Sequence, residues 1–361
     1  MTAHPRLLSV ATAAPPNILW QKDAERFARH LFSDVIATDP RLALVFEHAE
    51  IEKRHLCVPL EWLGKDHDFA EKNALYMEHA LSLGADVARK ALAEARLPPD
   101  SVDHLVFVSS TGLAAPSIDA RLANVLELRD DVRRTPIWGL GCAGGAVGLS
   151  RARDFALADP RSRVLLIALE LCSLTFQRND LSKKNLVAVS LFADGAAAAV
   201  VSGVESVVPR HGENPPLELQ GSRSTLWKDT LDVMGWDIDG DGLHVVFSRD
   251  IPTIVHEKVK PSLDAFLDSV GLDKSHLDHL VAHPGGVKVL AAYANALGLP
   301  VEALDHARDV LREYGNMSAP TCLFVLDRFQ RAREIAKGDH AVVTALGPGF
   351  SAEYVLVGRA A

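Results

Sequence analysis

The chain contains the same four-residue motif twice, and this repeat constrains the possible fold more than any other feature of the sequence. Asp103-His104-Leu105-Val106 recurs at 278–281, an offset of 175 residues (278 minus 103). An amphipathic helical pattern precedes each copy, and two further apolar segments typical of buried strands follow it. Strands that alternate with helices predict a layered α/β fold. We therefore interpret the chain as two halves of related topology, residues 1–205 and 206–361.

Cys142 and Asn316 occupy equivalent places in the two halves. Cys142 lies 38 residues after His104, and Asn316 lies 37 residues after His279. Both stand where the pattern predicts the start of a helix after a Gly-bearing turn. An internal duplication usually brings equivalent points together about a pseudo-two-fold axis, so we expect both helix N-termini in one cleft. His283 follows the second repeated strand and would reach the same cleft.

The turn around Cys142 has two interpretations. Its sequence, GLGCAG at 139–144, has the G-x-G-x-x-G spacing that can bind a dinucleotide. The acidic residue expected about 20 positions later would be Glu170, which is 26 residues past Gly144, so this signal is weak. In the other interpretation Cys142 is a nucleophile, because a helix N-terminus and a nearby imidazolium lower a thiol pKa from about 8.5 to about 3.5–7.5. We therefore expect an activated thiolate at Cys142.

Each of these three residues also has an ordinary structural interpretation. A cysteine in this pattern can be a buried apolar residue of a packed helix. His283 can be a loop histidine in the turn VAHPGG, and Asn316 can be a helix N-cap. The duplication favours the functional interpretation, because it carries all three side chains to the same place.

Composition and charge exclude several classes of function. The net charge is −9 and the isoelectric point is near 5.9, so we expect no nucleic-acid partner. The four cysteines are scattered without CxxC spacing, which indicates a reducing compartment and no metal site. DIDGDG at 237–242 resembles the start of a calcium loop. Its twelfth position is Ser248 where a Glu is required, so we predict a polar turn between strands.

The sequence also predicts that the protein does not span a membrane. It contains no run of 18 apolar residues. The apolar stretch after Arg6 is short, which favours a buried first strand before the Pro15-Pro16 turn over a signal peptide. We therefore expect a cytoplasmic protein.

Three separated motifs, which are Cys142 in GLGCAGGAVG, His283 in AHPGG and Asn316 in YGNMSAPT, resemble those of the type III polyketide synthases, the chalcone and stilbene synthase group. The segments SSTGLAAPS, LFADGAA, GLHVVFSRDIP and LGPGF extend this resemblance over nearly the whole chain. It implies a thiolase-like fold with a duplicated αβαβα arrangement, a homodimer, and no metal or prosthetic group as cofactor.

The resemblance also implies a reaction. In such enzymes the cysteine takes the acyl group of a starter acyl-CoA, malonyl-CoA loses CO₂, and the resulting enolate attacks the acyl-enzyme. Cys142 would carry the growing acyl chain. His283 would stabilise the thiolate and then, with Asn316, donate hydrogen bonds to the malonyl thioester oxygen.

Further site residues follow from the resemblance alone. Phe192 matches an aromatic gate between the coenzyme A tunnel and the cavity, and Lys53 and Arg54 lie near the region that binds the coenzyme A phosphates. The positions expected to line the substrate cavity are Ser110, Thr111, Ala115, Thr175, Trp236, Val245, Ser318 and Gly347.

Two departures from plant members concern the starter. Val245 replaces a second aromatic gate, and Ala115 replaces a large residue that reaches across the dimer. Both remove bulk, and the motifs RHLCVPLE and MGWD look more like bacterial members that use fatty acyl starters and make alkylresorcinols or alkylpyrones. Two alternatives remain open: an initiating ketoacyl-acyl-carrier-protein synthase that condenses once, and a non-catalytic relative that binds coenzyme A.

Overall fold

The computed structural model describes residues 3–209, 215–248 and 250–359, and its largest element is a nine-stranded mixed sheet in the order β11-β12-β13-β8-β1-β7-β6-β4-β5. From the contact between β1 and β8, the order reads β1-β7-β6-β4 in one direction and β8-β13-β12-β11 in the other. In each direction the first two pairs are antiparallel and the third is parallel. This matched order confirms the predicted duplication.

The sheet strands of the first half run within residues 6–202, and those of the second half run within residues 217–358. The sheet strands are β1 (Arg6–Ala13), β4 (His104–Val108), β5 (Arg133–Ile137), β6 (Arg163–Leu171), β7 (Asp194–Ser202), β8 (Leu217–Leu226), β11 (His279–Ala282), β12 (His340–Gly347) and β13 (Ser351–Gly358). The two copies of the repeated motif fall on β4 and β11, as the sequence predicts.

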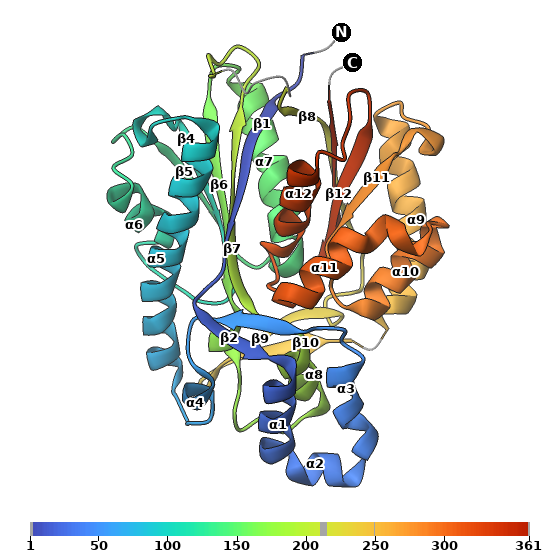
Figure 1. Ribbon diagram of the computed structural model, residues 1–361. Coiled ribbons are helices and arrows are strands. Elements are labelled where there is room, and N and C mark those ends of the chain that lie inside the picture. The colour runs from blue at the N-terminus through green and yellow to red at the C-terminus, as the bar shows by residue number, and fades with distance from the viewer. Residues whose placement is uncertain (1–2, 210–214, 249, 360–361) are drawn as a thin grey trace.

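We call the β1-β7-β6-β4 part and the β8-β13-β12-β11 part of the sheet the two half-sheets. Helices cover both faces of each half-sheet, which gives the layers αβαβα (Figure 1). The helix α5 packs on the outer face of β1, β6 and β7, and α9 packs on β8 and β13. Between the half-sheets, α7 contacts β6 and β13, and α12 contacts β1 and β11. The longer helices are α1 (Gln21–Leu31), α5 (Phe69–Ala95), α6 (Ile118–Val125), α7 (Gly144–Ala158), α8 (Lys183–Leu191), α9 (Ile251–Ser269), α10 (Val287–Leu297), α11 (Asp305–Tyr314) and α12 (Thr321–Ala332).

The strands are buried because they lie between helical layers. All nine residues of β7 are buried, and eight of the nine residues of β6, RVLLIALEL, are also buried. Near-continuous apolar runs of this kind are typical of strands covered on both faces. The central helices approach closely at Gly145, where a Cβ atom would lie 2.7 Å from the Cys322 Sγ atom.

Smaller elements gather at one end of the sheet, at the bottom of Figure 1. They form two hairpins, β2–β3 and β9–β10, and several short helices. Their bounds are β2 (Asn17–Trp20), β3 (Lys53–Leu56), β9 (Met234–Asp239), β10 (Gly242–Phe247), α2 (Ser33–Thr38), α3 (Leu44–Glu47) and α4 (Leu60–Leu63). The predicted polar turn at 237–242 is confirmed, because it joins β9 to β10.

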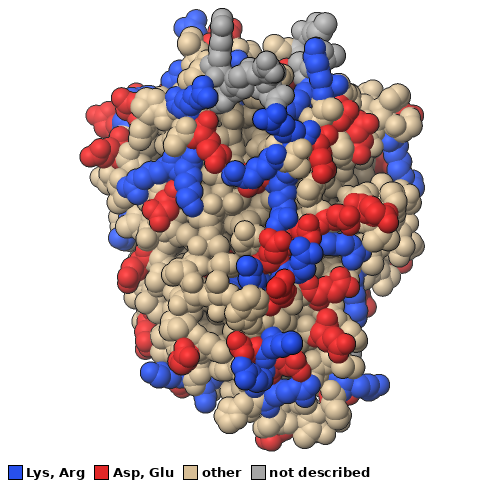
Figure 2. Space-filling view, in the orientation of Figure 1, with Lys and Arg blue, Asp and Glu red and all other residues tan. Residues whose placement is uncertain are grey.

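Within the described ranges, no helix is both long and apolar enough to cross a membrane. Basic and acidic side chains are interspersed over the face shown in Figure 2.

Candidate active site

Cys142 lies in a tight turn that leads directly into the central helix α7. The turn is a short 3₁₀ helix, Gly141–Ala143, and α7 begins at Gly144. Gly139 and Gly141 adopt positive φ angles of 87° and 44°, a backbone conformation that favours glycine. The Gly141 N–H donates a hydrogen bond to the Ser110 hydroxyl at 3.2 Å. The glycines of GLGCAG therefore form the turn that presents a thiol.

Asn316 lies opposite the thiol, but it is not the N-cap of a helix. Its Oδ1 atom accepts a hydrogen bond from the Ser318 backbone N–H at 2.8 Å and lies 4.0 Å from the Cys142 Sγ atom. Its Nδ2 atom donates to the Gly285 carbonyl at 3.3 Å. The helix α12 begins five residues later than Asn316, at Thr321, because Ser318 has a positive φ of 59° and interrupts the helical path.

His283 completes the expected group of three. It directly follows β11, and its backbone N–H donates to the Thr344 carbonyl at 2.8 Å. Its side chain is buried, and neither ring nitrogen has a hydrogen-bond partner among the described residues. Both nitrogens are therefore free to bind a substrate.

These three residues line one small cavity with an empty volume of about 330 Å³, which we call the Cys142 cavity. The rest of its wall is mostly apolar. The lining residues are Cys142, Met234, Phe247, Ile251, His283, Gly285, Val289, Tyr293, Asn316 and Leu346. The sequence therefore predicted the meeting of Cys142, His283 and Asn316 correctly.

The protonation of the thiol differs from the expected state. Burial in this apolar cavity raises the pKa of Cys142 to about 11, although hydrogen bonding from Ser318 opposes the rise. Burial also lowers the pKa of His283 to about 3. These shifts favour a neutral thiol and a neutral imidazole at neutral pH, because desolvation opposes the effect of the helix N-terminus, whereas the sequence predicts a preformed thiolate.

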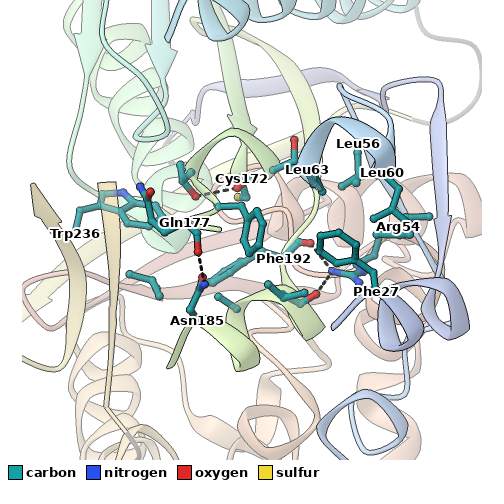
Figure 3. A pocket seen from close by; sticks show the side chains of 18 residues that line it. Phe27, Arg54, Leu56, Leu60, Leu63, Cys172, Gln177, Asn185, Phe192 and Trp236 are labelled. Carbon is teal, nitrogen blue, oxygen red and sulfur yellow. Dashed lines mark hydrogen bonds between the residues drawn. The ribbon is translucent and has the colours of Figure 1, made fainter. Parts of the chain in front are cut away.

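A second cavity lies beside the first and has an empty volume of about 630 Å³; we call it the apolar pocket. Its wall includes the predicted residues Thr175, Phe192, Trp236 and Val245. Figure 3 shows Phe192 in the middle of this pocket, with Trp236 on one side and Phe27 on the other. The other lining residues are Leu19, Ala24, Arg54, Leu56, Leu60, Leu63, Cys172, Ser173, Phe176, Gln177, Asn185, Ala188 and Val189.

Phe192 of the apolar pocket contacts a residue of the Cys142 cavity. Its ring contacts Phe247 edge to face, with the ring centroids 6.5 Å apart, and Phe247 lines the Cys142 cavity. The hairpin β9–β10 spans both cavities: its Met234–Phe247 pair faces the Cys142 cavity, and its Trp236–Val245 pair faces the apolar pocket. The role of Phe192 as a gate stays a prediction.

Comparisons with known proteins support one family. The family model "Chalcone and stilbene synthases, N-terminal domain" matches residues 2–205, and the corresponding C-terminal model matches residues 218–360. The chain belongs to the chalcone and stilbene synthase family. It is 41% identical to a Bacillus subtilis (strain 168) protein named "Putative chalcone synthase", with 97% of each chain covered. It is 40% identical to a 1,3,6,8-tetrahydroxynaphthalene synthase of Streptomyces peucetius subsp. caesius, over 97% of this chain and 92% of that protein.

Solved structures confirm the thiolase-like fold of this family. The 1,3,6,8-tetrahydroxynaphthalene synthase of Streptomyces coelicolor A3(2), a bacterial type III polyketide synthase, superimposes with a TM-score of 0.92 at 29% identity, covering 99% of each chain. A polyketide synthase from the brown alga Ectocarpus siliculosus superimposes with a TM-score of 0.89 at 28% identity, again over 99% of each chain.

Ser110 and Thr111, which the sequence predicts to line the substrate cavity, belong to a hydrogen-bond network around the buried Glu170. The Ser110 N–H and the Thr111 hydroxyl each donate to Glu170 Oε2 at 2.8 Å. Burial raises the pKa of Glu170 to about 8 despite these donors. From the sequence, Glu170 is considered only as the acidic residue of a dinucleotide-binding pattern, and this network is missed; the available signal is a lone carboxylate at the end of an apolar strand.

Other predicted residues lie outside both cavities. Ala115 is exposed on the loop before α6, so it lines neither cavity of this chain. Gly347 packs against the Cys142 turn, where a Cβ atom would lie 2.7 Å from the Ala143 Cβ atom. Its neighbour Leu346 lines the Cys142 cavity instead.

Arg54 is buried, which does not fit the predicted contact with coenzyme A phosphates. Its side chain is only 2% exposed, and its guanidinium donates to the backbone carbonyls of Val189 and Phe192. Lys53 is half-buried, with its ammonium 6.0 Å from the centre of the Trp20 ring. The two neighbours point to opposite sides because side chains alternate along β3.

Proposed function

We propose that this chain loads an acyl group from an acyl-CoA starter onto Cys142, extends it with malonyl-CoA, and releases a cyclised alkylpyrone or alkylresorcinol-type product. The observation that carries the proposal is the apolar pocket, which adjoins the Cys142 cavity across Phe192. No cofactor beyond the coenzyme A thioesters is needed for the steps below.

The neutral thiol and imidazole support a loading step with proton transfer. The Cys142 sulfur attacks the thioester carbonyl while its proton passes to His283. The carbon–sulfur bond to coenzyme A then breaks, and His283 returns the proton to the departing thiolate. A neutral His283 can act as this base, because it has a free nitrogen and lines the same cavity.

The same cavity supports decarboxylation of malonyl-CoA. The carbon–carbon bond to the carboxylate breaks, CO₂ leaves, and the electron pair becomes an enolate whose negative charge develops on the thioester oxygen. His283 can donate one hydrogen bond to that oxygen. Asn316 can donate a second one, because its amide has two N–H bonds and only one is used by Gly285. The enolate carbon then attacks the acyl carbonyl carbon on Cys142 and forms the new carbon–carbon bond. The carbon–sulfur bond to Cys142 breaks in the same step, and the departing Cys142 thiolate takes up a proton before the next loading.

The lining of the apolar pocket favours a fatty acyl starter. Each CH₂ group of a chain that leaves water for such a pocket contributes about 0.8 kcal/mol. Val245 stands where a bulkier aromatic side chain would reduce the space beside Trp236. A starter with several CH₂ groups therefore gains more from this pocket than a short starter does.

A second candidate product follows from the relatives. Two of the proteins described above are named for 1,3,6,8-tetrahydroxynaphthalene, which has no alkyl chain. Incubation with malonyl-CoA alone, and with malonyl-CoA plus acyl-CoA starters from acetyl to palmitoyl, distinguishes the candidates by mass spectrometry. Alkylated products from longer starters support the first. A product from malonyl-CoA alone supports the second, and a single condensation supports an initiating ketoacyl synthase.

We also propose that the chain works as a homodimer in the cytoplasm. Leu113, Val125 and Trp138 are each more than 40% exposed and lie near β5, which is an edge strand of the sheet. Exposed apolar side chains at a sheet edge favour association. The four cysteines are all free, which agrees with a reducing compartment. Light scattering after size-exclusion chromatography would give the mass of the dimer or of the monomer.

A further inference from the structure

Arg54 is a buried cation next to the apolar pocket, and coenzyme A binding does not explain it. It is among the largest fully buried side chains of the chain, and desolvation lowers its pKa to about 10. Removing a charge from water costs several kcal/mol unless hydrogen bonds or an opposite charge offset the loss. The contacts of the guanidinium therefore show which groups stabilise the buried charge.

The hydrogen bonds of Arg54 go to the end of helix α8. Its Nη1 atom donates to the Val189 carbonyl at 2.6 Å and to the Phe192 carbonyl at 2.9 Å. The last carbonyls of a helix lack partners within the helix and carry partial negative charge, so a cation there is favourable. Arg54 thus links the backbone at Val189 and Phe192 to β3 by two hydrogen bonds, which are drawn as dashed lines in Figure 3.

The same segment of backbone is paired with Asn316. The Asn316 N–H donates to the Leu191 carbonyl at 2.9 Å, and the Ala193 N–H donates to the Asn316 carbonyl at 2.9 Å. Arg54 also packs against this site directly, because a Cβ atom on Gly315 would lie 2.7 Å from the Arg54 Cγ atom. The side chain therefore lies between the gate segment and the residue before Asn316.

We propose that Arg54 is a positioning residue that fixes the Phe192 gate and, through the backbone pairing at 191–193, the amide of Asn316. This inference rests on the decarboxylating role proposed above for Asn316. Arg54 lines the apolar pocket but not the Cys142 cavity. Its loss should therefore impair decarboxylation, which depends on the Asn316 amide, much more than acyl loading, which depends on Cys142 and His283.

The test compares two rates in three variants. Arg54→Met removes the guanidinium and keeps an unbranched apolar side chain, and Arg54→Lys keeps a charge and a donor. Arg153→Met is the matched control, because Arg153 also donates to two backbone carbonyls, those of Leu219 and Gln220, in another part of the fold. Decarboxylation is the rate of CO₂ release from malonyl-CoA. Loading is the rate at which acetyl-CoA acylates Cys142, followed by mass spectrometry. This two-carbon starter has no alkyl chain to place in the apolar pocket, which Arg54 lines.

We expect Arg54→Met to lower CO₂ release at least tenfold while loading changes less than threefold. Arg54→Lys should recover part of the loss, and Arg153→Met should lower the melting temperature without changing the ratio of the two rates. A purely structural role would reduce both reactions by the same factor. Equal reductions in Arg54→Met, or no reduction, would overturn the proposal. If Arg54→Met does not fold, an unchanged ratio in Arg54→Lys overturns it.

Hydrogen exchange separates this inference from the proposed function. If the parent enzyme releases no CO₂ from malonyl-CoA, the proposed function fails, and the positioning claim is judged on the amides of Ala193 and Asn316. Faster exchange of both amides in Arg54→Met than in Arg153→Met supports the claim. Equal protection in the two variants contradicts it.

Discussion

The raised pKa of Cys142 leads to a prediction that distinguishes a neutral thiol from the preformed thiolate expected from the sequence. With the pKa of Cys142 raised to about 11, only about one thiol in 10⁴ is ionised at pH 7, compared with roughly 3% for an ordinary cysteine. Alkylation by iodoacetamide should therefore accelerate about tenfold for each pH unit between 7 and 10, because the thiolate is the reactive form. The measurement is the alkylation rate of the Cys142 peptide, followed by mass spectrometry over this pH range.

The chain supplies its own reference for this measurement. Burial raises the pKa of Cys322 to about 12, so its thiolate is about tenfold scarcer and its alkylation should be slower at every pH. His283→Ala should keep the tenfold rise of the alkylation rate with each pH unit, because a neutral imidazole does not determine the ionisation of the thiol. A rate that is constant from pH 6 to 9 in the parent enzyme and becomes pH-dependent in His283→Ala would refute this reasoning and show a preformed thiolate–imidazolium pair.

Three further predictions test other parts of the site and the fold. Asn316→Ala should lower CO₂ release from malonyl-CoA about 10²–10³-fold, as for loss of an oxyanion donor, while acylation of Cys142 persists; release at the parental rate would contradict the role given to Asn316. Val245→Phe should fill part of the apolar pocket and shift kcat/KM across starters from acetyl to palmitoyl toward shorter chains, and an unchanged chain-length profile would argue against the acyl site. Gly145→Ala should destabilise the chain by about 1–3 kcal/mol in urea unfolding through overpacking, whereas Gly235→Ala, which has open space around it, should not.

The sequence predicts the central part of this fold well, because the decisive signals there are local. The repeated motif at 103–106 and 278–281 forms equivalent strands, since each copy is a short apolar segment between an amphipathic helix and a turn. The glycines before α7 predict a tight turn for the same reason. The meeting of Cys142 with Asn316 then follows from the duplication, although no local pattern connects them.

The properties that the sequence does not predict depend on distant segments. The pKa of Cys142 is raised by burial in a cavity whose apolar wall includes Met234, Ile251 and Val289, and these residues belong to three separate elements. The inward direction of the Arg54 side chain depends on the pairing of β3 with β2, in which Arg54 lies opposite Leu19. One signal for it was available: in KRHL, Arg54 shares the inward face with Leu56, because side chains alternate along a strand.

The buried ionisable side chains of this chain explain how a largely apolar site can remain ordered. Arg54 holds the end of α8, Glu170 accepts hydrogen bonds from the loop that begins at Ser109, and Asp194 accepts from the backbone N–H groups of Cys57 and Ser173 at 2.7 Å each. Each of these side chains thus binds backbone or hydroxyl groups of a different segment beside the cavities. An apolar wall alone is not directional, whereas these hydrogen bonds have defined geometry. The polar scaffold behind the wall therefore sets the positions of Phe192 and Asn316, while the wall itself determines which acyl chains can bind.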